Sequence, residues 1–202
     1  MRTPEVIPVL ERLCNLLRME ARAFGLRYGL QPVQLEALTY ITRCNRYSNT
    51  PQAVTEYLGL TKGTVSQTIK VLEHKGLLRK QTDKHDKRKV HLSPSAKGRK
   101  LIEESLSAKG LGPVLNIAKS VETSELAPAL RLALHSMQQA NGLKTFAACH
   151  TCRFNEIHEN GYFCGLTQEA LSTQDIQLIC REHQYPPRTD LKRIGEKEKV
   201  RR

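Results

Sequence analysis

The chain has 202 residues, of which 32 are Lys or Arg and 20 are Asp or Glu, so its formal net charge is +12. A basic excess of this size favours polyanionic partners, while an aromatic content of 5% without Trp argues against proteins that stack single-stranded bases. No apolar run approaches the roughly 20 residues that cross a bilayer, and the amino terminus lacks the layout of a signal peptide. We therefore expect a cytoplasmic chain, without a membrane partner, that has one large core and a small appendage.

A long amphipathic helix is predicted near the amino terminus, within residues 1–29. Its apolar side chains recur at helical steps, at Val6, Leu10, Leu13, Leu17, Ala21 and Phe24. This stripe has no obvious partner within a small domain, so we expect a second copy of the chain to cover it. The alternative is that the terminal helices cover the back of their own chain. A further helix is predicted from Gln31 and Pro32, with Leu35 and Leu38 on its packing face.

Two more helices are predicted between Thr50 and Gly76, separated by a tight turn. Pro51 suits a first helical position, because the N–H that it lacks would have had no partner there, and Gly59 ends the short apolar stripe that follows. The hydroxyl of Thr61 can cap the next helix, and Gly76 can adopt the left-handed conformation that ends it. A short helix, a tight turn and a longer helix have helix-turn-helix spacing.

The second of these two helices has one apolar face and one polar face. Val65, Ile69 and Leu72 recur at four- and three-residue steps and are expected to face a core. The polar positions left outside are Lys62, Thr64, Ser66, Gln67 and Lys70. Side chains that donate and accept hydrogen bonds suit contact with base edges in the major groove of DNA.

A basic hairpin is predicted directly after Gly76, because alternating apolar residues bracket the polar run 81–89. Residues 79–100 hold nine Lys or Arg against two Asp, a net charge of +7. Such a loop repels itself unless an anion lies nearby, although a solvated surface loop is the alternative explanation. Its attachment to a helix-turn-helix favours DNA, and the shape predicted is a winged helix.

The stretch from about Leu30 to Leu106 resembles the winged helix of the MarR family, above all in LEHKGLLRKQTDKHDKRKVHLSPSAKG. In that family an Asp-x-Arg motif of the wing places an Arg in the minor groove, held by the Asp, and Asp86 and Arg88 match it. Leu92, Ser93 and Gly98 match the stretch that follows, while Pro94 departs from the pattern and stiffens the exit of the wing. The resemblance implies a dimeric, nucleoid-associated transcriptional regulator, commonly a repressor released by a small molecule or by oxidation.

The fold class expected is therefore mainly α with a small β-wing, in an α+β arrangement. The winged helix-turn-helix would occupy residues 30–95, and helices expected in residues 96–144 would join the amino-terminal helix in dimerisation. The helices would include Leu101, Ile102 and Leu106, then 114–118, then 126–137. The residues expected to contact DNA are Lys62, Thr64, Ser66, Gln67, Lys70, Lys84, Asp86, Lys87, Arg88 and Lys89.

Four of the six cysteines lie in a segment predicted for residues 145–185. Cys149 and Cys152 form a C-x2-C pair, and Cys164 and Cys180 follow after eleven and fifteen residues. Disulfides are disfavoured in a reducing compartment, so this cluster predicts a metal site, with Zn²⁺ preferred over an iron–sulfur cluster although the spacing does not decide between them. The third alternative is reduced or redox-active cysteines without a metal.

The cysteine segment is predicted to be structural or sensory and not catalytic. Neither H-E-x-x-H nor the H-x-E and P-C-x-x-C pair of nucleobase deaminases is present, and four thiolates leave no open position for a substrate. His150, His158 and His183 could replace a cysteine as ligands but are expected to be surface histidines. We therefore expect no enzyme, and no thioredoxin-like setting is visible around Cys149.

Three further expectations complete the description of the chain. Cys14 and Cys44 are expected to be buried as small apolar residues, with an oxidation sensor at Cys14 as the alternative. Residues 186–202 are expected to form a basic disordered tail. A rival function is a winged-helix docking or scaffold module with a zinc-held interaction segment, but docking does not require the polar helix face or the charge of the wing.

Overall fold

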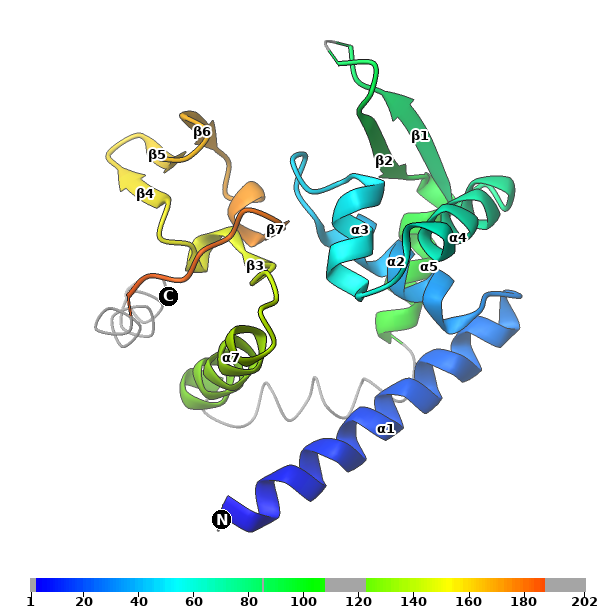
Figure 1. The fold of residues 1–202 in the computed structure, drawn as a ribbon, viewed down its shortest axis with the longest axis horizontal. Coiled ribbons are helices and arrows are strands. Elements are labelled where there is room, and N and C mark those ends of the chain that lie inside the picture. The colour runs from blue at the N-terminus through cyan, green and yellow to red at the C-terminus, as the bar shows by residue number, and fades with distance from the viewer. Residues whose placement is uncertain (1–2, 85, 108–122, 188–202) are drawn as a thin grey trace. The chain divides into compact units, whose positions relative to one another are not determined.

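The computed structural model describes residues 3–84, 86–107 and 123–187. Its residues divide into two compact units, and one unit combines 1–42 with 60–119. The other combines 43–59 with 120–202. The first helix of the helix-turn-helix therefore belongs to the same unit as the cysteine segment, whereas the second helix and the wing belong to the other unit. Figure 1 shows the elements of both units.

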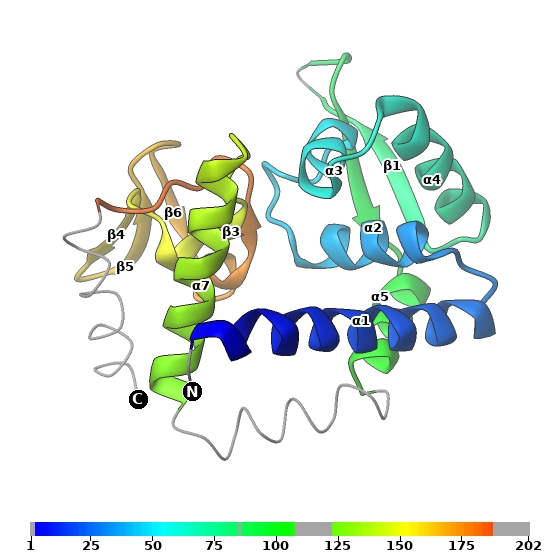
Figure 2. The ribbon, with the colours of Figure 1, turned by 60° about the horizontal axis from the view of Figure 1, so that its bottom comes forward.

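The first unit contains four described helices and one hairpin. The helices are α1 (Thr3–Arg27), α2 (Pro32–Arg43), α4 (Lys62–His74) and α5 (Ala96–Ser107), and the strands are β1 (Leu78–Thr82) and β2 (Val90–Pro94). Its core collects the apolar faces of α2, α4 and α5 with the base of the hairpin. The largest side chains buried there are Tyr40, Leu38, Ile69, Leu72, Leu78, Leu92 and Ile102. Figure 2 shows α1 as one continuous rod.

Helix α4 begins and ends where its capping residues predict. The Thr61 hydroxyl accepts a hydrogen bond from the Thr64 N–H at 3.2 Å, satisfying one free donor of the first turn. At the other end Gly76 has a φ of +69°, and the Leu77 N–H donates to the Leu72 carbonyl at 2.9 Å. This pair of features is a Schellman motif, so the chain turns directly from the helix into β1.

The hairpin pairs β1 with β2 in antiparallel register, from Leu78 opposite Pro94 to Thr82 opposite Val90. Pro94 therefore lies at the base of the hairpin, where the chain leaves the wing for α5. The two described strands of this sheet bury Leu78 and Leu92, while the other residues of β1 are exposed. The predicted winged helix is confirmed in its elements, and the described part of the unit is mainly helical.

The second unit combines two described helices with a small β-rich segment. The helices are α3 (Pro51–Leu58) and α7 (Thr123–Ala140). The strands are β3 (Ala147–Ala148), β4 (Asn155–His158), β5 (Gly161–Cys164), β6 (Glu169–Leu171) and β7 (Ile179–Cys180). Short 3-10 turns, η1 (Cys149–Thr151) and η2 (Asp175–Gln177), connect them.

Two small antiparallel sheets organise the cysteine segment. Strands β4, β5 and β6 form one, and β3 pairs with β7 in the other, with Ala147 opposite Cys180 and Ala148 opposite Ile179. Few apolar residues are buried here; among the described ones they are Phe146, Cys149 and Ile176. Helix α3 has the predicted start, because the Thr50 hydroxyl accepts from the Ala53 N–H at 3.2 Å, and Gly59 ends it with a φ of +63°.

Some of the features expected from the sequence lie in residues that the structure does not describe, and one of them differs from the structure. The helix expected at 114–118 and residues 188–202 of the tail expected at 186–202 lie outside the described residues. Cys44 is buried as expected, but the expectation was wrong for Cys14, which is exposed because residues 11–16 of α1 are exposed throughout in the single chain. Among the described helices, none has the length and apolar content needed to cross a membrane.

Candidate nucleic-acid interface and cysteine segment

The outer face of α4 is polar along its whole length. Val65, Ile69 and Leu72 are buried as the periodicity predicts. The positions expected to contact DNA are exposed, namely Lys62, Thr64, Ser66, Gln67 and Lys70. This face offers amide, hydroxyl and ammonium groups to an external partner and no large apolar side chain, which is the composition that a DNA groove requires.

The tip of the wing is ordered by two aspartates that accept hydrogen bonds from the loop itself. The Asp83 carboxylate accepts from the Asp86 N–H at 2.9 Å and lies 2.9 Å from the His91 ring. Asp86 Oδ1 accepts from the backbone N–H of Arg88 at 3.1 Å and from its Nε at 3.2 Å. The predicted contact between Asp86 and Arg88 is therefore present in the structure.

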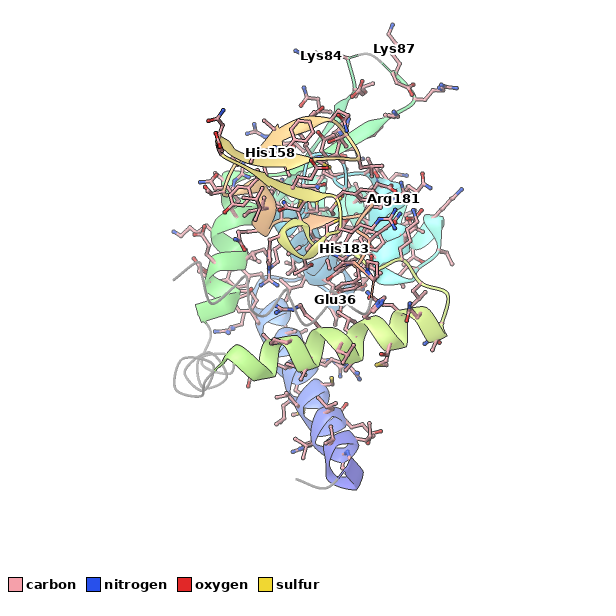
Figure 3. The ribbon with its side chains drawn as sticks, turned by 90° about the vertical axis from the view of Figure 1, so that its left-hand side faces the viewer. Glu36, Lys84, Lys87, His158, Arg181 and His183 are labelled. Atoms are coloured by element: carbon pink, nitrogen blue, oxygen red, sulfur yellow. The ribbon has the colours of Figure 1, made fainter. Side chains whose placement is uncertain are left out.

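The cations at the tip of the wing are exposed, whereas Lys80 of β1 donates to Glu73 of α4. The Arg88 side chain is 92% exposed although Asp86 holds its Nε, so its terminal nitrogens remain available to an external acceptor. Lys84, Lys87 and Lys89 are also exposed, and Lys84 and Lys87 project from the tip of the hairpin (Figure 3). A cationic loop with an anchored arginine suits a narrow anionic groove better than it suits bulk solvent.

Known proteins share this arrangement of helix, turn, helix and wing. Residues 28–89 match the model of the MarR family. This match covers the helix-turn-helix and the wing as far as Lys89, and the matched family is one of DNA-binding transcription factors, not of enzymes. No curated protein sequence matches the chain.

Solved structures agree with this assignment at the level of the fold. A mutant MepR from a multidrug-resistant Staphylococcus aureus clinical isolate has a TM-score of 0.52 at 19% identity, covering 65% of this chain and 94% of its own. A MarR family protein from Bacillus stearothermophilus has a TM-score of 0.50 at 20% identity, covering 68% and 94%. CouR from Rhodococcus jostii, solved with p-coumaroyl-CoA, has 0.50 at 16%, covering 64% and 88%. The chain thus has a MarR-like winged-helix fold.

Large apolar side chains remain exposed on two helices that the matched segment does not include. On α1 they include Ile7, Val9, Leu13, Leu16 and Met19, and on α7 they include Leu130, Leu132, Leu134 and Met137. Each of these two helices also has a polar side, so each is amphipathic and not apolar all round. Such faces are typical of surfaces that a second chain covers.

None of the four cysteines forms a disulfide bond. Cys149 begins η1, Cys152 directly follows it, and Cys164 and Cys180 end strands β5 and β7. Cys149 follows β3 and Cys180 ends β7, so the pairing of these two strands brings both residues to one sheet. Burial raises the pKa of the Cys149 thiol to about 11; a hydrogen bond from Asn155 lowers it, and the neighbouring Cys152, Cys180 and Cys164 raise it further. The four side chains are therefore electrostatic neighbours.

Donors directed at sulfur distinguish Cys152 from an ordinary thiol. The backbone N–H groups of Gln184 and Phe154 donate to its Sγ, the former at 3.5 Å, and both lower its pKa against the larger rise caused by burial. The Asn155 amide similarly donates to Cys149 Sγ at 3.6 Å. Such donors suit thiolates. In the described part of the chain, however, no group of three or more Cys, His, Asp or Glu side chains stands close enough to hold a metal as it is.

The three histidines of the segment differ in their surroundings. His183 is only 3% exposed, so its expected surface position was wrong: Thr145 and Thr151 flank its two ring nitrogens at 2.9 and 3.0 Å, and both nitrogens are engaged. Burial lowers its pKa to about 4, which keeps the ring neutral. His158, labelled in Figure 3, is exposed as expected, and it pairs with Glu156. His150 is half-buried, with its Nδ1 3.1 Å from the Ile176 carbonyl oxygen. His183 is thus a structural residue of the segment and not a spare ligand.

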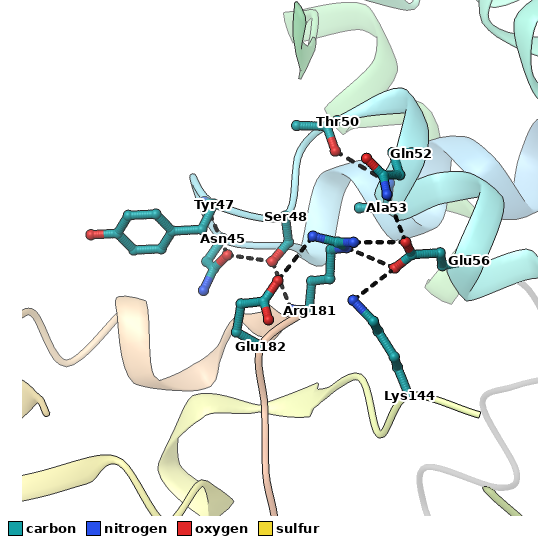
Figure 4. Close-up of polar contacts among 10 residues, drawn as sticks. All are labelled: Asn45, Tyr47, Ser48, Thr50, Gln52, Ala53, Glu56, Lys144, Arg181 and Glu182. Carbon is teal, nitrogen blue, oxygen red and sulfur yellow. Dashed lines mark hydrogen bonds and ion pairs between the residues drawn. The ribbon is translucent and has the colours of Figure 1, made fainter. Parts of the chain in front are cut away.

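Sequence reasoning missed one set of residues, which joins the cysteine segment to α3. The Arg181 guanidinium donates to both carboxylate oxygens of Glu56 at 2.7 Å (Figure 4). These two residues are 125 positions apart, and no local pattern in the chain indicates their contact.

Proposed function

We propose that the chain is a MarR-type transcriptional repressor that binds double-stranded DNA as a homodimer. One observation carries the proposal: an exposed polar face on α4 is followed at once by a wing whose tip carries the exposed cations Lys84, Lys87, Arg88 and Lys89. The match of residues 28–89 to the MarR family supports it. The partner is a pseudo-palindromic operator in cytoplasmic, nucleoid-associated DNA.

In this proposal α4 enters the major groove and reads base edges. Gln67 pairs with adenine through its amide, and Thr64 or Ser66 contacts bases or phosphates. Lys62 and Lys70 lie on the same exposed side of the helix and neutralise phosphates. Phosphate contacts and base contacts thus come from one face of α4. The phosphate contacts position the helix on the duplex, and the base contacts discriminate between sequences.

The wing enters the adjacent minor groove in the same complex. Asp86 fixes the Nε of Arg88, so the terminal nitrogens are presented with little loss of side-chain freedom on binding. Lys84, Lys87 and Lys89 surround this arginine and contact phosphates. Release of condensed counterions by these lysines makes the affinity fall steeply as salt is added.

In a homodimer, the winged helix of the second subunit contacts the second half of the operator. The apolar side chains exposed on α1 and α7 are the surfaces that we assign to the two-fold interface. Two wings related by such an axis are expected roughly 34 Å apart, which is one turn of duplex. The effector that releases DNA is a small molecule or an oxidant; CouR, with a similar fold, was solved with a coenzyme A ester.

The cysteine segment is proposed to bind a metal through Cys149, Cys152, Cys164 and Cys180. Zn²⁺ is the first choice because four thiolates suit its tetrahedral coordination, and an iron–sulfur cluster is the second. Burial raises the pKa of both Cys149 and Cys152, and the N–H groups that donate to their Sγ atoms partly offset this rise and would stabilise the thiolates of a metal-bound form. Metal ligation would also stabilise the fold of a segment that buries little apolar surface. Structural zinc can contribute on the order of 10 kcal/mol to the folding free energy of such a segment.

Selection of duplexes from a random-sequence pool, followed by titration of the selected duplex, tests the function. Arg88→Ala should weaken binding of that duplex by about 1 to 3 kcal/mol and relax its sequence preference within the minor-groove site. Arg153→Ala removes the same charge from an exposed residue of the cysteine segment that the proposal does not assign to DNA, and it should leave the affinity within about twofold. No enrichment of any sequence by the wild-type chain would refute the proposal.

A further inference from the structure

Residues 83–89 connect β1 to β2 at the tip of the wing (Figure 1). This loop contains four of the cations that we assign to DNA, Lys84, Lys87, Arg88 and Lys89. Like charges on so short a loop repel one another and favour open conformations. Arg88 is therefore presented to DNA in one orientation only if other contacts hold the loop closed.

Asp83, the first residue after β1, closes this loop with both its backbone and its side chain. Its N–H donates to the Lys89 carbonyl at 3.0 Å, and its Oδ1 accepts from the Asp86 N–H at 2.9 Å. The Asp86 carbonyl in turn accepts from the Lys89 N–H at 2.8 Å. Asp83 thus fixes the backbone of Asp86, whose carboxylate accepts from the N–H and the Nε of Arg88.

His91 of β2 engages the second oxygen of the Asp83 carboxylate. Its Nε2 lies 2.9 Å from Asp83 Oδ2, and an ionised carboxylate only accepts, so the ring nitrogen is the donor. The register places His91 opposite Gln81, two residues before Asp83, which makes Asp83 and His91 diagonal neighbours across the hairpin. With one oxygen bound to Asp86 and the other to His91, the Asp83 carboxylate cannot turn without breaking a hydrogen bond.

The pair of His91 and Asp83 is partly shielded, whereas the arginine that it supports is open to a partner. Both side chains of the pair are 27% exposed, against 92% for Arg88. A polar contact that is partly removed from water is stronger than the same contact at an open loop tip. All of these contacts lie within the hairpin and its loop, so they belong to the first unit alone.

We propose that His91 is a positioning residue for DNA recognition, which acts through Asp83 and Asp86 to hold Arg88 in its binding orientation before DNA arrives. The inference rests on the proposed function and adds a residue that the assigned DNA contacts do not include. Holding one long side chain in advance removes part of the ordering cost of binding. The contribution of His91 to affinity therefore depends on the presence of Arg88.

Titration of a selected duplex with single and double variants of the full chain tests this role. His91→Ala should weaken binding about three- to tenfold, which is what ordering one long side chain costs. In the Arg88→Ala background the same change should have less than about a twofold effect, because the group through which His91 acts is gone. His91→Gln keeps an N–H donor at the position of Nε2 and should restore the wild-type affinity.

A measurement without DNA follows the same contacts in the free protein. The amide protons of Asp86 and Arg88 should exchange faster in His91→Ala than in the wild type, as measured by NMR, while exchange in α4 stays unchanged. His158→Ala is the matched control, because His158 is also paired with a carboxylate, 3.1 Å from Glu156, but lies in the cysteine segment. It should change neither the affinity for DNA nor the exchange in the wing.

The outcomes separate this inference from the proposed function. An unchanged affinity of His91→Ala would overturn the inference, and so would an equal loss with and without Arg88, because His91 would then contact DNA itself or support the whole hairpin. A His91→Gln variant as weak as His91→Ala would also overturn it. Absence of binding to every duplex by the wild-type chain would refute the proposed function instead. Exchange of the Asp86 and Arg88 amides would then still decide whether His91 holds the arginine, and unchanged exchange would show that it does not.

Discussion

Gly98 lies in α5 where the helix passes the base of the wing, and replacing it tests how the wing is anchored. A Cβ added at this position would lie 2.1 Å from the Leu77 carbonyl oxygen and 3.4 Å from Leu38 Cδ1. Real Cβ contacts below 3.0 Å are essentially never seen, so the Leu77 backbone must move by about 1 Å. The same oxygen accepts the Ser95 N–H at 2.9 Å, so this movement also strains the hydrogen bond at the exit of the hairpin.

The expected cost of Gly98→Ala follows from these contacts. Overpacking contributes about 1 to 3 kcal/mol and the strained hydrogen bond about 1, while the helix propensity of Ala returns about 1. The net loss is about 1 to 3 kcal/mol, measured as a lower midpoint of urea unfolding by circular dichroism. Gly63→Ala is the matched control, because Gly63 is exposed in α4 with its nearest neighbour 3.8 Å away, and it should stabilise by up to about 1 kcal/mol. A Gly98→Ala variant as stable as the wild type would refute the reasoning.

Three further predictions follow from single contacts. Thr61→Ala removes the cap of α4 and should lower stability by about 1 kcal/mol in thermal unfolding; an unchanged midpoint would show that water replaces the hydroxyl. The hydrogen bonds from the Arg181 guanidinium are the main cause that lowers the pKa of Glu56 to about 2. The stability that the ionised Glu56 gives to the folded protein is therefore complete above the ordinary pKa of 4.5 and is lost as the pH falls toward 2. In metal-free protein the stability gap between wild type and Glu56→Gln should therefore shrink over that range, and a constant gap would contradict the assignment. Lys84→Ala should reduce the slope of log affinity against log salt by about 1 for each subunit that binds, and an unchanged slope would exclude a phosphate contact.

The parts of this protein that sequence predicts are those set by neighbouring residues. Thr61 and Gly76 define α4 because a cap and a left-handed stop act within one helical turn. Asp86 and Arg88 meet in the wing because they are two residues apart in a tight loop. Local chemistry of this kind can be recognised from the sequence alone. The segment that matches the family model, residues 28–89, contains these positions.

The contacts that sequence does not reveal are those between distant residues. Arg181 and Glu56 carry no periodic or motif signal, since a charged pair on two surfaces can be formed by many other combinations in a chain with 32 Lys or Arg. The burial of His183 was missed for the same reason: it depends on Thr145, 38 residues away. Only the fold shows that the cysteine segment is seated on α3.

The salt dependence of duplex binding tests the central claim most directly. Five lysines on each subunit, Lys62, Lys70, Lys84, Lys87 and Lys89, are exposed and assigned to phosphates, so a dimer makes on the order of ten such contacts. The account predicts that affinity for a selected duplex falls by about 10³ to 10⁵ between about 50 and 200 mM salt. Affinity that does not change with salt, or the absence of binding at the lower concentration, would contradict it.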